Sequence, residues 1–274
     1  MRLVGYQPQY FPRLHYFARV LDSDIFTISD YLQYVRHHVY EHGAERERGP
    51  SYQAHTPLKN ANGILMLDVP VKRGGEDGKQ LITEALIDYS TPWHEKHLQN
   101  IEHHYKKSPG SARLLPSLQA LFESRYATLA DLTIGSILWS LGRLFEMDQD
   151  VPTLDDLHAR LPGGTRLTRI VRMSESGIPM ADKGSGRDAN DWIIETCRSL
   201  GATEYHFGGT SASAYMDFDR FRDAGISLKQ QEWRCAPYRQ QFPKRGFIPN
   251  LSILDLLMNV TPEEARAVLH TRDA

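Results

Sequence analysis

The sequence predicts an α/β fold with a mostly parallel sheet and an added helical layer. The chain opens with a short strand at Arg2 to Tyr6, a helix that begins near Leu14 and a second strand over 24–30. The same alternation of strand, helix and strand returns between 166 and 207. Strands that alternate with helices favour a parallel sheet with helices on its faces, so both halves of the chain indicate the same fold class.

The elements before residue 106 follow from apolar spacing and from the positions of proline and glycine. Pro8 and Pro12 prevent a helix before Arg13, and apolar residues then recur at helical spacing as far as Leu21. We expect an irregular excursion over 32–62, where glycine and proline interrupt a run rich in histidine and charged residues. The remaining elements expected in this part are strands over 64–71 and 81–87 and a helix over 92–105.

The second half predicts a helical layer followed by another unit of strand, helix and strand. Two helices are expected over 114–126 and 129–147. A strand over 166–173, a loop over 180–188, a helix from Asp188 to Gly201 and a strand over 203–207 follow in that order. The last helices are expected over 251–258 and after Thr261, because the Thr-Pro-Glu-Glu run combines an N-cap residue with a proline at the first helical position.

Length and composition are typical of one soluble domain. The chain has 274 residues, 41% of them hydrophobic, and its 32 basic and 34 acidic residues give a formal net charge of −2. This balance provides no overall field that would attract nucleic acid or anionic lipid. Two cysteines do not make a disulfide framework, and no secretory signal is evident, so we expect a cytoplasmic protein with no membrane partner. We expect a single α/β domain over 1–274 with a helical insertion at about 92–160.

Polar side chains follow the first two predicted strands, at the edge where open α/β sheets bind ligands. Gln7 follows the first strand, and Asp30, Gln33 and Tyr34 follow the second. An aspartate at this edge can accept an amine proton or orient a hydroxyl, and an Asx turn or a helix cap is the structural alternative. Convergence of Gln7 with Asp30 would favour the functional interpretation.

Glycine and histidine residues provide further candidates. Gly208 and Gly209 follow the strand over 203–207 and would let backbone N–H groups approach a phosphate or carboxylate, unless they form a simple tight turn. Among the twelve histidines, His15, His37 and His206 are the best placed to act as a general base. The histidine spacing does not favour a metal site.

A segment near the end of the chain combines aromatic, amide and basic residues. It runs from Trp233 to Phe242 and contains Tyr238 and Gln240. Such a segment can bind a sugar or a nucleotide by stacking and hydrogen bonds, and an ordinary strand and loop is the alternative. Lys59 is a candidate counter-charge for an anionic ligand. No Gly-x-Ser-x-Gly motif is present, so a covalent acyl-enzyme has no support.

A series of short motifs extends over nearly the whole chain. Its members are Gln7-Pro8-Gln9-Tyr10-Phe11-Pro12, Asp30 with Gln33-Tyr34, Thr56-Pro57-Leu58-Lys59, Val69-Pro70-Val71, Trp93 with His97, Leu200-Gly201-Ala202 with Tyr205, Tyr238 with Gln240, and Pro249-Asn250-Leu251-Ser252. In this order they resemble the WbqC-like protein family of bacterial polysaccharide and specialised biosynthesis gene clusters. The chain departs from the family pattern at Arg13-Leu14-His15, where an aromatic residue, leucine and glycine are common. At fold level only, the opening unit also resembles the Rossmann-like, nucleotide-binding fold of adenylyltransferases.

The resemblance and the residues together predict a biosynthetic transferase that moves an acyl or aminoacyl group onto an amine of a sugar or small metabolite. Asp30, or a histidine such as His37, would take the amine proton, while Gln7 would orient the acceptor. The residues predicted to bind substrate are Tyr10, Gln33, Tyr34, Lys59, Tyr205, Gly208, Gly209, Tyr238 and Gln240. The expected donor is an activated acyl, aminoacyl or nucleotide compound, and no metal is expected.

Two alternatives stay open. An ATP-dependent ligase or nucleotidyltransferase of the same fold would bind a nucleotide at the loop after the first strand and would depend on magnesium. A non-catalytic protein that presents a sugar or a carrier to a partner enzyme would bind its ligand without turnover. A tRNA or a carrier protein is a further partner that the sequence leaves open.

Overall fold

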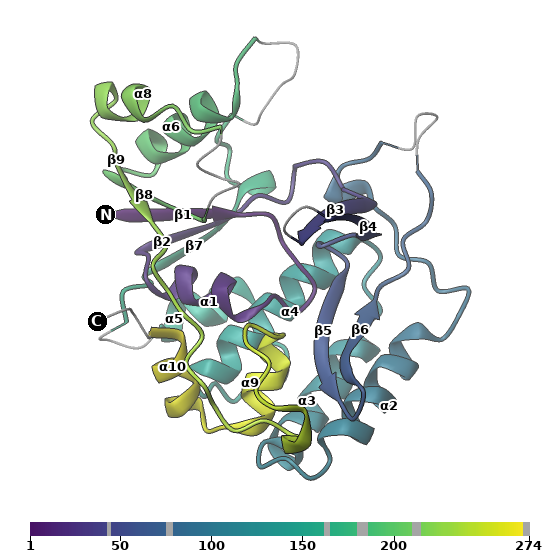
Figure 1. Ribbon diagram of the computed structural model, residues 1–274. Helices are drawn as coiled ribbons and strands as arrows, with labels where there is room; N and C mark the ends of the chain where they lie inside the picture. The colour runs from purple at the N-terminus through teal and green to yellow at the C-terminus, as the bar shows by residue number, and fades with distance from the viewer. Residues whose placement is uncertain (43–44, 75–78, 162–164, 180–185, 210–214, 271–274) are drawn as a thin grey trace.

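The protein is built around a five-stranded parallel sheet (Figure 1). The structure is a computed structural model, and it describes residues 1–42, 45–74, 79–161, 165–179, 186–209 and 215–270. The strands of the sheet, in spatial order, are β7 (Arg169–Arg172), β2 (Ile25–Ile28), β1 (Arg2–Tyr6), β8 (Glu204–Phe207) and β9 (Ser227–Gln230). The chain moves outward from β1 to β2 and β7, and then returns to the opposite side of β1 with β8 and β9. The strand order therefore reverses between β1 and β8.

Helices cover both faces of this sheet. Successive strand side chains point to opposite faces, and those of β2 are buried on both. Val4 and Phe26 belong to a large core shared with α1 (Leu14–Leu21) and α10 (Pro262–His270). Leu3 and Ile25, one position earlier on each strand, belong to a second core shared with α6 (Ala189–Ser199) and α8 (Phe218–Asp223). Figure 1 shows α6 and α8 above the sheet and α1 and α10 below it.

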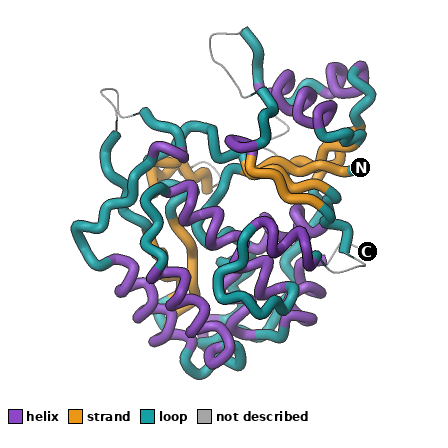
Figure 2. The backbone as a smooth tube through the Cα atoms, turned by 180° about the vertical axis from the view of Figure 1, so that it is seen from behind, coloured by secondary structure: helices purple, strands orange, loops and turns teal. Residues whose placement is uncertain are grey.

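The chain also forms a helical layer and two antiparallel hairpins (Figure 2), and the helices and the hairpin over 55–68 extend the large core on the α1 side. The helices are α2 (Trp93–Tyr105), α3 (Ser111–Glu123), α4 (Leu129–Leu144), α5 (Leu154–Arg160) and α9 (Ile253–Asn259). The hairpins are β3 (His37–His42) with β4 (Glu45–Pro50), and β5 (His55–Asn60) with β6 (Gly63–Asp68). In the described part of the chain, no helix is both long and apolar enough to cross a membrane.

The chain between β9 and α9 is mostly extended. It runs past α1 and α10 and reaches the short 3-10 turn η3 (Pro243–Arg245) at the far end of the molecule (Figure 1). Side-chain bonds fix it along its length: Trp233 Nε1 donates to the Val268 carbonyl at 3.0 Å and Tyr238 Oη donates to Asp255 at 2.6 Å. We refer to residues 231–250 as the C-terminal strap.

The predicted parallel strands and the longer helices are confirmed, with shifts of a few residues at their ends. The irregular excursion predicted over 32–62 was wrong, because this part contains β3, β4 and β5. The strand predicted over 81–87 was also wrong, since Ile82–Glu84 form a 3-10 turn, η1. β5 was missed because it contains Pro57, which a two-stranded ribbon tolerates on an edge strand. Most of the loop predicted over 180–188 lies outside the described residues.

Candidate functional site

A cavity of about 750 Å³ lies at the carboxyl ends of β1, β2 and β8, against α6. This is the position where the strand order reverses, and open α/β sheets bind their ligands at that position. The sheet residues that line the cavity are Leu3, Gly5, Tyr6, Thr27, Tyr205 and Phe207. The opposite wall comes from α6, with Trp192, Ile193 and Thr196. The cavity thus has the size and the mixed apolar and polar lining of a small-molecule site.

Two arginines, Arg19 and Arg187, line the cavity, and Arg19 is the more deeply buried of them. It lies in α1 and is 8% exposed. Its Nε and Nη2 atoms both donate to Oε1 of Gln231, at 3.1 and 2.7 Å, and its guanidinium carbon lies 4.5 Å from the centre of the Tyr6 ring. Gln231 in turn donates to the carbonyl of His15 at 2.8 Å. The strap and the Tyr6 ring therefore hold the guanidinium in one orientation.

The charge of Arg19 is not neutralised within the described residues, where no carboxylate forms an ion pair with it. Only two of its five N–H groups have a protein acceptor in the described part of the chain, which leaves three for a ligand. A buried cation without a counter-ion is costly, and an anion that binds it would remove this cost. Carboxylate and phosphate match the planar fork of a guanidinium.

Gly208 is needed for Arg19 to occupy this position. A Cβ atom at Gly208 would lie 2.5 Å from Nη2 and 3.0 Å from Nη1 of Arg19, which is too close for both groups to stay in place. Gly209 differs, because a Cβ there would have no atom of the described residues within 4 Å. The two glycines that the sequence predicts as an anion cradle therefore have separate roles: Gly208 makes room for the guanidinium, and Gly209 borders open space in the cavity.

The loop after β1 does not offer free backbone donors to an anion at the start of α1. The Leu14 N–H donates to the Leu251 carbonyl at 3.1 Å, and the His15 N–H donates to Asn250 Oδ1 at 3.0 Å. Earlier in the loop, the N–H groups of Tyr10 and Phe11 are bonded to Gln53 and Ser136. The protein itself therefore satisfies these N–H donors in the loop and at the start of α1.

His15 is the histidine that lines the cavity. Its Nδ1 lies 3.1 Å from Asn250 Oδ1, so Nδ1–H donates to the amide oxygen and the lone pair resides on Nε2. Burial lowers the pKa of His15 to about 4, with a further lowering from the cations Arg19 and Arg13, against a hydrogen bond to Asn250 that raises it. The imidazole is therefore neutral at pH 7 and able to accept a proton at Nε2.

Gln7 lies where the sequence predicts, at the rim of the cavity. Its Oε1 accepts hydrogen bonds from the Tyr52 hydroxyl and from Gln53 Nε2, the latter at 2.6 Å. These two bonds fix the amide orientation and leave the NH₂ group of Gln7 to donate to a ligand. Four of the twelve predicted site residues line the cavity: Gln7, Tyr205, Gly208 and Gly209.

Asp30 does not line the cavity and is fully buried. Its carboxylate accepts from Arg172 Nε at 2.7 Å, from the Ser174 hydroxyl at 2.6 Å and from the Ser174 N–H at 3.0 Å. Both oxygens are occupied, so the geometry favours a structural role that joins the ends of β2 and β7 over the predicted role as a base. The same loop reaches the cavity through its neighbours Tyr31 and Leu32.

Lys59, Tyr238 and Gln240 lie together in a buried polar cluster that is separate from the cavity. Lys59 Nζ donates to Gln240 Oε1 at 3.1 Å, and Asp255 accepts from Tyr105 and Tyr238 at 2.6 Å each. Burial lowers the pKa of Lys59 and raises the pKa of Asp255. This cluster connects the strap to β5, α2 and α9. Lys59, Tyr238 and Gln240 therefore do not meet Gln7 and Tyr205 in the cavity, as the predicted site requires.

The other predicted residues also lie away from the cavity. Tyr10 is fully buried, with its hydroxyl 3.0 Å from His97 Nδ1. His37 is exposed on β3. Gln33 and Tyr34 pair through their backbones with Leu81 and Gln80. Among the described residues, no group of three His, Cys, Asp or Glu side chains could hold a metal ion.

The sequence interpretation missed Arg19, Gly5 and Gln231. Arg19 lies four residues after His15 in a helix whose other side chains are mostly apolar, and this break in the apolar stripe was a usable signal. Gly5 interrupts a strand, which often marks close approach of another group. Gln231 carried no signal, because only the path of the strap brings it to α1.

Comparison with known proteins identifies the family of this chain. The model of the WbqC-like protein family matches residues 7–267. The chain is similar to the uncharacterized protein Rv1507c of Mycobacterium tuberculosis strain H37Rv, with 27% identity over 259 residues, which cover 94% of this chain and 93% of that protein. No solved structure matches it significantly. The chain therefore belongs to the WbqC-like protein family.

Proposed function

We propose that the protein is a biosynthetic group transferase, which binds an activated donor through an anionic group at Arg19 and transfers an acyl or aminoacyl group onto an amine of a sugar or small metabolite. The observation that carries this proposal is the buried guanidinium of Arg19, fixed by Gln231 and Tyr6 but without a carboxylate partner in the described chain. Such a cation destabilises the protein by itself, and an anionic ligand provides its physical reason.

The strand order supports a donor of the nucleotide type. Numbered along the chain, the five strands lie in the order 3-2-1-4-5, which is the order of Rossmann-like sheets. In those sheets the phosphates usually lie at the N-terminus of the first helix. Here that N-terminus is occupied by Asn250 and Leu251, and Arg19 takes over the contact with the anion. This difference weighs against the alternative of a ligase with a nucleotide at the loop after β1.

The residues of the cavity can then be assigned roles. The lone pair of the acceptor amine attacks the acyl carbon, a C–N bond forms, and the bond from that carbon to the donor's leaving group breaks. The leaving group departs with the electron pair and its charge is stabilised by Arg19. The proton released by the amine passes to Nε2 of His15, in place of the predicted Asp30 or His37. The NH₂ group of Gln7 orients the acceptor.

Thermal stabilisation by candidate donors tests the proposal, because a ligand that binds the native state raises the melting temperature by mass action. The panel contains pyrophosphate, nucleotides, nucleotide sugars, acyl carriers and aminoacyl-tRNA. We expect one anionic class to stabilise the wild type and to have no effect on Arg19→Met. Without ligand, Arg19→Met should unfold at the same temperature or higher, because it removes an uncompensated buried charge. Equal stabilisation of wild type and Arg19→Met would contradict the proposal.

Turnover separates the transferase from a protein that only presents its ligand. With the donor class found by stabilisation, a transferase consumes the donor in the presence of an amine acceptor, and His15→Gln lowers this rate about 10²-fold or more if His15 accepts the proton. A binding protein shows stabilisation but no turnover with any acceptor.

The adjacent glycines provide a matched pair for the same assay. We expect Gly208→Ala to weaken binding of pyrophosphate at least about tenfold, which corresponds to about 1.4 kcal/mol, because the new methyl displaces the guanidinium. Gly209→Ala places its new Cβ more than 4 Å from every described atom beyond its chain neighbours, and it should change the affinity less than about threefold. Titration calorimetry measures both. Equal affinities of the two variants would show that Arg19 is not held against Gly208.

A further inference from the structure

The floor of the cavity carries three hydroxyl groups around Gly5 of β1. A Cβ atom at Gly5 would lie 3.1 Å from Thr27 Oγ1, 3.6 Å from Tyr205 Oη and 3.9 Å from Ser29 Oγ. Gly5 pairs with Thr27 across β1 and β2, and Tyr205 comes from β8 on the other side of β1. We call Thr27, Ser29 and Tyr205 the hydroxyl floor. The missing side chain of Gly5 leaves the space above it empty.

The hydroxyl floor has unused hydrogen-bonding capacity. Thr27 donates to the carbonyl of Val4 at 3.2 Å and retains its lone pairs. The hydroxyls of Ser29 and Tyr205 have no hydrogen-bond partner in the part of the chain that the structure describes. Burial raises the pKa of Tyr205, so its hydroxyl stays protonated and uncharged at neutral pH. Uncharged groups that both donate and accept match the hydroxyls of a ligand, which do the same.

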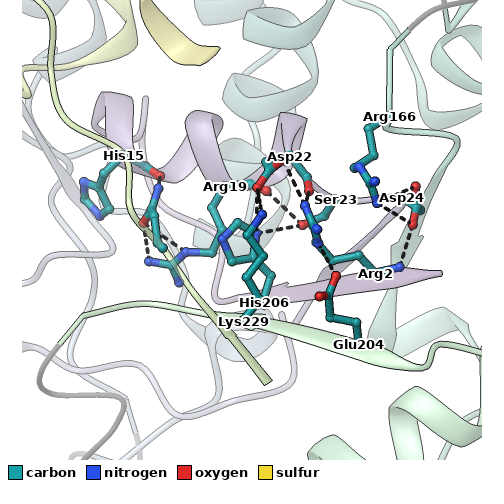
Figure 3. Close-up of polar contacts among 11 residues, drawn as sticks. Arg2, His15, Arg19, Asp22, Ser23, Asp24, Arg166, Glu204, His206 and Lys229 are labelled. Carbon is teal, nitrogen blue, oxygen red and sulfur yellow. Dashed lines mark hydrogen bonds and ion pairs between the residues drawn. The ribbon is translucent and has the colours of Figure 1, made fainter. Parts of the chain in front are cut away.

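The hydroxyl floor and the anion contact lie next to each other. Gly5 precedes Tyr6, and the Tyr6 ring packs between Tyr16, at 4.1 Å between ring centres, and the Arg19 guanidinium. Arg19 also acts electrostatically on Tyr205. Figure 3 shows Arg19 reaching from α1 toward β8. A ligand in this part of the cavity therefore meets a cation at one end and neutral hydroxyls beside it.

We infer that the cavity binds a phosphorylated polyhydroxyl ring, with its phosphate on Arg19 and its ring hydroxyls on the hydroxyl floor of Thr27, Ser29 and Tyr205. This inference rests on the proposed function in taking Arg19 as the anion contact, and it adds the chemical class of the ligand. A free sugar phosphate, a nucleotide sugar and the ribose phosphate of a nucleotide share this chemistry.

Titration calorimetry on the full chain tests the inference with inorganic phosphate and with ribose 5-phosphate, glucose 1-phosphate and UDP-glucose, which also distinguish the sources. Propyl phosphate serves as the control without hydroxyls. At least one sugar compound should bind about tenfold more tightly than inorganic phosphate, whereas propyl phosphate should not. If phosphate binds and no sugar compound exceeds it by threefold, the inference is overturned. If phosphate itself does not bind, the anion contact of the proposed function fails instead.

Two substitutions locate the added affinity. Gly5→Ala fills the space above the floor and should remove the advantage of the sugar compound while changing the affinity for inorganic phosphate less than about twofold. Tyr205→Phe removes one hydroxyl without changing the shape of the side chain. It should lower the affinity for the sugar compound about three- to tenfold and leave the affinity for inorganic phosphate unchanged. Should Gly5→Ala fail to fold, Tyr205→Phe decides. The assignment of the ring hydroxyls to the hydroxyl floor would be overturned if a variant lost equal affinity for phosphate and for the sugar compound. It would also be overturned if Tyr205→Phe lost no affinity for the sugar compound.

Discussion

Lowering the pH from 7 to 5 is expected to reduce the free energy of unfolding by about 3 to 6 kcal/mol. His55, His97 and His206 are each 6% exposed or less, and burial lowers their pKa to about 4, 4 and 3. These values lie below the value of about 6.5 in the unfolded chain, so the unfolded state binds protons first as the pH falls. The neutral histidines therefore contribute fully to the free energy of unfolding above pH 6.5, and this contribution decreases toward pH 4. By pH 5 each histidine has lost about 2 kcal/mol of it.

Two carboxylates change the free energy of unfolding in the opposite direction. Their effect is the reason for the lower value, about 3 kcal/mol, of the expected loss. Burial raises the pKa of Asp255, and that of the more exposed Asp68 to about 6. They regain stability as the pH falls, because their folded-state pKa lies above the unfolded value. Their gain therefore offsets part of the loss of stability from the histidines.

Urea unfolding at pH 7, 6 and 5 measures the pH effect. His97→Gln is the internal control, because it removes one of the buried protonation sites, to which His15 with its pKa of about 4 also belongs. It should reduce the difference between pH 7 and pH 5 by about 2 kcal/mol, whatever its effect at pH 7. A free energy of unfolding that stays constant or rises down to pH 5 would show that these imidazoles are not held neutral in the native protein.

Replacing Asp30 with alanine is expected to cost about 3 to 5 kcal/mol of stability. The substitution removes a fully buried carboxylate that accepts three hydrogen bonds from Arg172 and Ser174. It leaves the Arg172 guanidinium with weaker partners and the Ser174 hydroxyl without an acceptor at that position. Denaturant unfolding measures the change. Because of this loss of stability, any activity measured for an Asp30 variant must be divided by its folded fraction before Asp30 is considered as a catalytic residue.

Glu175→Gln provides the matched comparison. Glu175 forms another ion pair with Arg172, at 3.1 Å, but its side chain is 65% exposed. An exposed pair is screened by water and contributes about 0 to 1 kcal/mol, so this variant should be close to wild type. Similar losses for Asp30→Ala and Glu175→Gln would contradict the view that burial of Asp30 makes the difference.

Local patterns were sufficient for the regular parts of the fold. The strand at β1, the apolar spacing of α1 and the capped final helix are each specified by neighbours in the sequence, and the structure contains all three. The strands β3, β4 and β5 were not predicted, because their histidine, charged and proline residues have low strand propensity, and antiparallel pairing compensates for it. Their partner strand β6 was expected over 64–71 from its apolar run.

The position of the site was predictable, but most of its side chains were not. Sequence alone determined that the chain is an α/β protein in which Gln7 follows the first strand, since strands, helices and loop positions follow from local spacing. Tertiary structure alone decided that Asp30 is enclosed by Arg172, that Lys59 and Tyr238 form a separate cluster, and that the strap brings Gln231 to Arg19. These outcomes depend on contacts between residues more than 100 positions apart, and no local pattern encodes them.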